Sequence, residues 1–231
     1  SVSCVLSAVA IIPSAPVLVP GLAGAAAAEL TDLYAAVRAA GATLPQRWIG
    51  IGADRAEDRV GPDAVGTFAG YGTDVPVAMS PDAHTTTVMP LCALITGWLR
   101  GQIAPRAVSE TRCYPISLEL PLAMACGRAL RAEIDECGEP VGVLVVADGA
   151  NTLTPSAPGG HDPDSVAVQS ALDDALATGD TGTLAGLPAG VIGRVAFAVL
   201  AGLAGSGPAA ARELYRGAPY GVGYFVGVWQ P

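Results

Sequence analysis

The chain of 231 residues contains no lysine, and all twelve of its basic residues are arginine. The absence of lysine excludes a Schiff-base nucleophile, an anchor for pyridoxal phosphate and a P-loop lysine. Aromatic residues make up only 5% of the chain. With a formal net charge of −9, the chain also lacks the clustered cations that nucleic acids and anionic membranes attract. We therefore expect no nucleic-acid partner and no membrane partner.

Cysteine is present in odd number and without a paired motif. No two of the five form a C-x-x-C pair; they are Cys4, Cys92, Cys113, Cys126 and Cys137. This pattern predicts small buried thiols in a reducing cytosol and argues against a disulfide framework or a zinc site.

Two apolar segments decide the expected compartment. Residues 2–19 are apolar but contain Pro13 and Pro16 and have no basic flank, so they predict a buried strand rather than a signal peptide. The most hydrophobic helix candidate, 191–204, is shorter than the roughly 20 residues that span a bilayer. We expect a soluble cytoplasmic protein.

Predicted strands and helices alternate along the chain. The clearest strand is the uninterrupted, β-branched run VGVLVVA at 141–147, which is typical of a strand buried on both faces. The other expected strands are 2–12, 47–52, 107–114 and 220–229, and the expected helices are 24–40, 89–99, 118–136, 164–177, 191–204 and 208–215. The polar segment 53–82 predicts a loop over the strand ends. The pattern predicts a single α/β domain over 1–231, with a central mixed sheet and helices on both faces.

Two segments, 145–163 and 213–224, carry a resemblance to a known family. On these residues the chain resembles the class III extradiol ring-cleavage dioxygenase superfamily, the LigB-like fold shared with the MEMO proteins. The aspartate that follows the central strand of the family corresponds to Asp148, and the Pro-Gly-Gly loop behind it is kept at 158–160.

Histidine positions of this family are occupied by other residues. The family's Pro-His-x-Pro element is Pro-Ser14-Ala-Pro here, the histidine after its second strand is Ala53, and its Asp-x-Ser-His element ends in Asn151. A further histidine-bearing element of the family corresponds to a segment of this chain that contains Glu119 and no histidine. The resemblance thus implies a pocket formed by Ser14, Asp54, Glu119 and Asn151 together with Asp148.

Ring cleavage in this family implies Fe(II) held by two imidazoles and a carboxylate, with another histidine moving protons. The hydroxyl of Ser14, the methyl group of Ala53 and the amide of Asn151 supply neither the nitrogen ligands nor a group that titrates near neutral pH. The chain has two histidines in all. We therefore expect no metal, no cofactor and no dioxygenase activity. The first hypothesis is a ligand-binding or interaction module whose partner is an unidentified small molecule or protein.

The alternative hypothesis is an enzyme that uses the old pocket, with Asp148 and His161 as an acid/base pair and Asn151 or Ser14 positioning the substrate. A residual metal-dependent oxidoreductase belongs to the same alternative. The structural interpretations stay open beside it: Asp148 bracing the turn 149–160, and His161 as a loop residue near a helix start.

A third hypothesis is a homo-oligomer in which a partner subunit completes the site. Its basis is the apolar final strand expected at 220–229, near a self-association surface.

Overall fold

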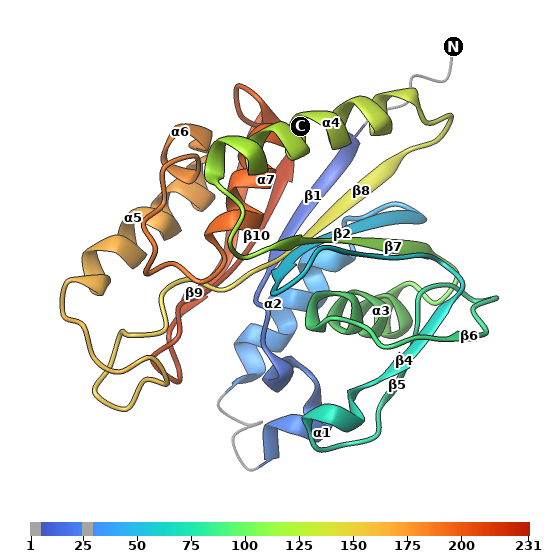
Figure 1. Cartoon of the computed structure of the whole chain (residues 1–231), viewed down its shortest axis with the longest axis horizontal. Coiled ribbons are helices and arrows are strands. Elements are labelled where there is room, and N and C mark those ends of the chain that lie inside the picture. Colours follow the sequence, from blue (N-terminus) through green and yellow to red (C-terminus); the bar gives the residue numbers. More distant parts are fainter. Residues whose placement is uncertain (1–5, 25–29) are drawn as a thin grey trace.

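The computed structural model describes residues 6–24 and 30–231, and a seven-stranded mixed sheet runs through its middle (Figure 1). The strand order is β3-β7-β2-β8-β1-β10-β9. Their bounds are β1 Leu6–Ile12, β2 Arg47–Asp54, β3 Asp58–Val60, β7 Val108–Pro115, β8 Val141–Val146, β9 Ala210–Gly217 and β10 Tyr224–Gln230. The four strands β7, β2, β8 and β1 are parallel, whereas β3, β10 and β9 run antiparallel to their neighbours. The carboxyl ends of the four parallel strands therefore meet at one edge.

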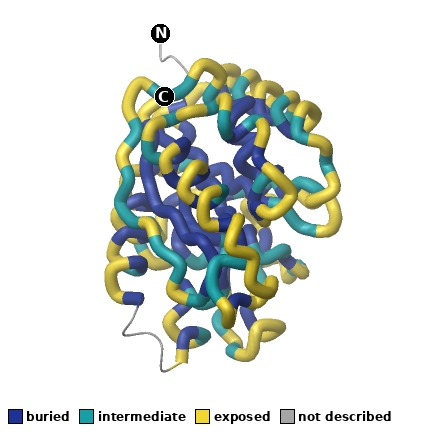
Figure 2. Tube along the Cα trace, turned by 90° about the vertical axis from the view of Figure 1, so that its left-hand side faces the viewer, coloured by how far each residue is buried: buried dark blue, intermediate teal, exposed yellow. Residues whose placement is uncertain are grey.

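Helices cover both faces of this sheet, as the sequence predicted. One face packs against α2 (Thr31–Gly41) and α3 (Leu91–Ile103). The other packs against α4 (Leu120–Glu136), α5 (Ser165–Thr178), α6 (Thr181–Leu184) and α7 (Arg194–Ala204). In β8, Leu144 and Val146 face the first layer while Val143 and Val145 face the second. This double burial explains the uninterrupted apolar run, and Figure 2 shows the buried trace running through the middle of the molecule.

A second, three-stranded sheet with the order β5-β4-β6 lies beside α3. It consists of β4 (Ala64–Thr67), β5 (Pro76–Ala78) and β6 (Thr85–Thr86), with a 3-10 helix, η3 (Phe68–Tyr71), between β4 and β5. The prediction that 53–82 is loop was therefore wrong. Two further short helices, η1 (Pro16–Leu18) and α1 (Pro20–Ala23), follow β1.

Helices α4 and α7 pack backbone to backbone through two glycines. A Cβ atom at Gly127 would lie 2.0 Å from the carbonyl oxygen of Val199, and one at Gly202 would lie 2.0 Å from that of Met124. Neither position has room for a side chain, so the spacing of these helices depends on glycine.

Several predicted boundaries differ from those observed. The segment 208–215, predicted as a helix, lies mostly in β9 (Ala210–Gly217), which pairs with β10 at the sheet edge. The predicted helix 24–40 is observed as α2 from Thr31, and positions 25–29 lie outside the described residues, as do 1–5 with Cys4. The final strand, β10, is paired on both sides by β1 and β9. Across the described ranges, no helix combines the length and apolar character needed to cross a membrane.

Candidate functional site

A small cavity of about 270 Å³ lies at the carboxyl edge of the parallel strands, and we name it the inner cavity. Its residues come from the ends of β1, β2, β7 and β8, from η3, and from the starts of α3 and α7, so the topology brings together segments far apart in sequence. The polar lining residues are Ser14, Asp54, Tyr71 and Asp148. The remaining lining is Ala53, Leu91, Ile116, Val146, Ala147, Ile192, Gly193 and Ala196. Ligands of α/β sheets commonly bind at this edge.

Asp148 lies where β1 leaves the sheet. The backbone N–H of Ser14 donates a hydrogen bond of 2.7 Å to Asp148 Oδ1. Beyond this point the segment that follows β8 pairs with the residue before β10, because the Gly149 N–H donates to the Gly223 carbonyl and the Gly223 N–H donates to the Ala150 carbonyl, both at 2.8 Å. The Asp148 carboxylate therefore accepts the hydrogen bond from the Ser14 N–H that a neighbouring strand would otherwise accept.

The carboxyl group of Asp148 is desolvated. Burial raises its pKa to about 7, although the hydrogen bond from the Ser14 N–H acts in the opposite direction. The residue as a whole is half-buried and reaches the inner cavity. Tyr224, at the start of β10, lies near it: burial and then the charge of Asp148 raise the pKa of this tyrosine. A carboxyl group that titrates near neutral pH in a cavity is a candidate for ligand binding or proton transfer.

Gln169 of α5 supports the segment that carries Asp148. Its Oε1 accepts a 2.8 Å hydrogen bond from the Ala150 N–H, and its Nε2 donates one of 2.8 Å to Asp173 Oδ1. Both side chains are buried. A Cβ at Gly149 or Gly223 would lie 2.0 or 2.1 Å from Gln169 Oε1, so two glycines make room for this amide.

We predict that Gln169→Leu destabilises the protein by about 2 kcal/mol, because it leaves the buried Ala150 N–H and Asp173 carboxyl without partners. Urea unfolding monitored by circular dichroism measures this change. The matched control is Gln102→Leu, since Gln102 is exposed and its stability effect should stay within about 0.5 kcal/mol. Equal effects of the two substitutions would contradict a bracing role.

The predicted site residues separate into two groups. Ser14, Asp54 and Asp148 meet at the inner cavity. Glu119 and His161 are exposed and are not among its lining residues. The bracing contact of Asp148 is made to the segment after β1, and no hydrogen bond from the turn 149–160 to its side chain is seen in the described part of the chain.

Asn151 and His84 are also not among the residues that line the inner cavity. The backbone carbonyl of Asn151 accepts a 2.9 Å hydrogen bond from the Gly159 N–H, and its side chain packs against that glycine. This arrangement holds the loop 151–160 closed. Nδ1 of the exposed His84 lies 2.9 Å from the Asp82 carbonyl oxygen.

The donor set of the inner cavity does not fit a ferrous ion. The groups that line it are two carboxylates, a serine and a tyrosine, whereas the ring-cleaving site requires two imidazoles. Both histidines belong to exposed segments outside this lining. Within residues 6–24 and 30–231, no group of three or more histidine, cysteine, aspartate or glutamate side chains is arranged to hold a metal.

The lining residues that sequence reasoning missed include Tyr71, Ile192 and Gly193. Tyr71 belongs to the segment predicted as loop, and Gly193 was placed inside a predicted helix. A Cβ at Gly193 would lie 2.7 Å from the Asp148 carbonyl oxygen, which accepts the Gly193 N–H at 2.8 Å. The glycine thus lets the start of α7 approach Asp148, a tertiary requirement with no signal in local sequence.

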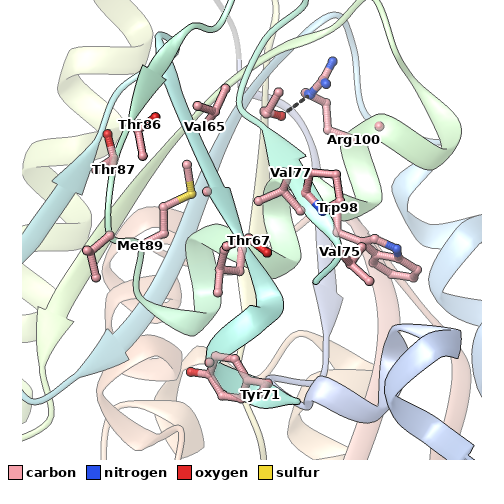
Figure 3. A pocket seen from close by; sticks show the side chains of 18 of the residues that line it. Val65, Thr67, Tyr71, Val75, Val77, Thr86, Thr87, Met89, Trp98 and Arg100 are labelled. Atoms are coloured by element: carbon pink, nitrogen blue, oxygen red, sulfur yellow. Dashed lines mark hydrogen bonds between the residues drawn. The ribbon is translucent and has the colours of Figure 1, made fainter. Parts of the chain in front are cut away.

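A second cavity, of about 930 Å³, lies over the small sheet and along α3, and we name it the outer cleft (Figure 3). Its labelled side chains are Val65, Thr67, Tyr71, Val75, Val77, Thr86, Thr87, Met89, Trp98 and Arg100. Arg100 is buried and donates hydrogen bonds to the carbonyls of Ala78, Pro105 and Ala107 at 2.9, 2.7 and 3.1 Å. These bonds join the end of α3 to β5 and to the loop before β7.

Comparison with solved structures finds chains of similar fold, among them an uncharacterized bacterial protein. The crystal structure of the uncharacterized protein JW3007 from Escherichia coli K12 is similar with a TM-score of 0.56, over 97% of this chain and 100% of that chain, at 12% sequence identity. The two chains share a fold. At this identity the likeness carries no information on activity. No protein family model and no curated protein matches the sequence.

Proposed function

We propose that this chain is a LigB-like protein, related to the class III extradiol dioxygenases, that binds a small molecule at the inner cavity and does not cleave rings. One observation carries the proposal: a desolvated carboxyl group, Asp148, faces a cavity at the carboxyl edge of the sheet, where the lining offers no imidazole among the described residues. The sequence resemblance at 145–163 and 213–224 supports the family, and the inner cavity supports the position of the ligand-binding site.

The lining determines the kind of ligand that fits. A volume of about 270 Å³ lies just below the usual range for ligand sites and suits a molecule with a single ring. Apart from Ser14, Asp54, Tyr71 and Asp148, the wall is apolar. Two carboxyl groups disfavour an anionic ligand. We therefore infer a neutral molecule with an apolar body and at least one hydroxyl group, and catechol is a suitable probe.

We predict that catechol binds more tightly as the pH rises from 6 to 8.5, because the ionised carboxylate of Asp148 accepts a stronger hydrogen bond from a hydroxyl than the neutral acid does. The expected gain is about tenfold. Isothermal titration calorimetry at both pH values measures it. Asp148→Asn should remove the pH dependence and weaken binding at pH 8.5 by about the same factor.

Glu119→Gln and His161→Gln are the matched controls for this titration. Both residues were predicted at or beside the pocket, and both are exposed outside the lining of the inner cavity. Neither substitution should change catechol affinity by more than about twofold. Absence of catechol binding to the wild type, or loss of binding in His161→Gln with Asp148→Asn unaffected, would contradict the proposal.

The expected absence of ring cleavage is tested by a separate experiment. The protein is expressed with iron supplementation, its iron content is determined by elemental analysis, and oxygen uptake is followed with catechol. We expect substoichiometric iron and no uptake above the buffer rate. Stoichiometric iron that disappears in His161→Gln would restore the dioxygenase interpretation.

The second candidate is an enzyme that uses Asp148 for acid/base chemistry. The raised pKa of about 7 favours it, because a general acid or base works best near the operating pH. Its proposed partner, His161, is exposed outside the lining of the inner cavity. An NMR time course of bound catechol separates the candidates: an unchanged probe at saturation supports binding alone, whereas conversion that requires Asp148 supports an enzyme.

A further inference from the structure

Helix α3 packs closely on β2 at two glycines, Gly50 and Gly52, with β7 beside them (Figure 1). A Cβ at Gly50 would lie 2.6 Å from Thr96 Oγ1 of α3 and 3.0 Å from Thr111 Oγ1 of β7. Thr111 pairs with Gly50 in the parallel register of β2 and β7. Side chains of α3 and β7 therefore meet over a position of β2 that has no side chain of its own.

The same arrangement recurs two residues further along β2, where the two side chains are cysteines. Cys92 precedes Thr96 by one turn of α3, and a Cβ at Gly52 would lie 2.2 Å from the Cβ of Cys92 and 2.6 Å from its Sγ. Cys113 pairs with Gly52 in the register of β2 and β7. Both cysteines belong to the core cluster on the α2 and α3 face of the sheet. The two thiols therefore lie together over Gly52.

The reduced pair is shielded from solvent. Cys92 is 3% exposed and Cys113 is 1% exposed, and both are free thiols. The hydrogen bond with the Cys113 side chain, and then burial, raise the pKa of the Cys92 thiol. Because a protonated thiol is a poor nucleophile, the pair is suited only to a small, strong oxidant. The other described cysteines, Cys126 and Cys137, are half-buried and belong to α4 and its C-terminal end.

We propose that Cys92 and Cys113 are a redox-sensitive pair that hydrogen peroxide oxidises to a disulfide between α3 and β7. The sulfur of one cysteine attacks the peroxide, the O–O bond breaks, and a sulfenic acid and water form. The sulfur of the other then attacks the sulfenic sulfur, the S–S bond forms and the S–O bond breaks. The released hydroxide takes up the second thiol proton as water. Peroxide is thereby reduced to two water molecules, and a dithiol such as dithiothreitol reverses the bond.

The disulfide would fix the first turn of α3 on the sheet. Cys92 follows Leu91, and Gly52 precedes Ala53; both Leu91 and Ala53 line the inner cavity. The bond closes a loop that contains α3 and the segment before β7, and closing such a loop stabilises a fold mainly by restricting the unfolded chain. The inference is independent of the ligand of the inner cavity, because it requires neither Asp148 nor a bound molecule.

The test uses a variant with Cys4→Ser, Cys126→Ser and Cys137→Ser, which leaves Cys92 and Cys113 as its only thiols. The folded, reduced variant is treated with hydrogen peroxide, catalase removes the peroxide, and remaining thiols are blocked with iodoacetamide in urea. Peptide mapping by mass spectrometry without reductant should find the two cysteine peptides linked with the loss of two hydrogen atoms, and dithiothreitol should separate them. The Tm of the oxidised variant should be about 5–10 °C above that of the reduced one. Amide hydrogen exchange in the first turn of α3 should be slower.

The matched control is the opposite variant, with Cys4→Ser, Cys92→Ser and Cys113→Ser. Its two thiols, Cys126 and Cys137, are the more accessible ones but lie roughly 16 Å apart along α4, too far to bond. Peroxide should therefore form no intramolecular disulfide in it and should not raise its Tm.

Three results would overturn the proposal, each read from the variant that keeps Cys92 and Cys113. The first is recovery of both cysteines as free thiols after peroxide treatment of the folded chain, with linkage only in urea. The second is oxidation of either cysteine to a sulfinic acid without a link. The third is a link that lowers the Tm, because the pair would then be strained rather than arranged to bond.

Discussion

Replacing Asp148 by asparagine should stabilise the protein at alkaline pH. Burial raises the pKa of this carboxyl group from 3.8 to about 7 in the folded chain. Folding is therefore favoured when the group is protonated, and its contribution to stability is lost as the pH rises through about 7. Between pH 5 and 8.5 the loss is on the order of 3 kcal/mol, or roughly 6–12 °C in Tm. An asparagine cannot ionise, and its side-chain oxygen still accepts the Ser14 N–H.

The measurement is thermal unfolding of wild type and Asp148→Asn at pH 5, 7 and 8.5. The difference in unfolding free energy should shift in favour of the variant as the pH rises. Glu119→Gln removes one negative charge from an exposed position and controls for the change in net charge. Parallel pH profiles for wild type and Asp148→Asn would show that the carboxyl group ionises as freely in the folded chain as in the unfolded one. A variant that gains stability while losing ligand would mark Asp148 as a residue kept for binding.

Gly127→Ala should destabilise the protein by about 3 kcal/mol or more. The added methyl group would lie 2.0 Å from the Val199 carbonyl oxygen and 2.7 Å from the Leu203 nitrogen, which are backbone atoms and cannot turn aside. Helices α4 and α7 must then separate, and the apolar contacts between them are lost. Gly202→Ala should have a similar effect, because its methyl group would meet the Met124 carbonyl oxygen from the other helix.

Gly101→Ala is the matched control for the helix glycines. Gly101 also lies within a helix, α3, but a Cβ there meets no atom within 4 Å. Alanine has the higher helix propensity, so this variant should be more stable by about 0.5–1 kcal/mol. Urea unfolding of the three variants gives the comparison. If Gly127→Ala also increased the free energy of unfolding, as Gly101→Ala should, the close packing of α4 on α7 would be contradicted.

The main sheet was largely predictable because its inner strands carry strong patterns. The run at 141–147 is apolar throughout, and β8 indeed packs helices on both faces. Residues 208–215 misled the prediction, since Ala, Arg, Glu and Leu favour helix, yet the segment pairs with β10 at the edge. There, strand pairing outweighs local propensity. The small sheet was missed because its strands are two to four residues long and too short to show a period.

The candidate site was predictable only where sheet topology determines it. Ser14, Asp54 and Asp148 end or follow parallel strands, so their convergence follows from strand order. Tyr71 and Gly193 reach the inner cavity through the packing of the small sheet and of α7. His161 and Glu119 were placed by analogy with a family pocket, and both are exposed on the surface of this chain. Local sequence does not encode which loop turns inward.

The inner cavity exists only in the completed chain topology, because its walls come from positions as distant as Ser14 and Ala196. Contacts of such sequence separation form late in folding, after the loops between them have closed. A partly folded chain, or either half released by a cut in the mostly exposed loop at 155–163, lacks a full set of walls. A ligand bound there would therefore select the fully assembled molecule and, by mass action, would protect it against unfolding and proteolysis.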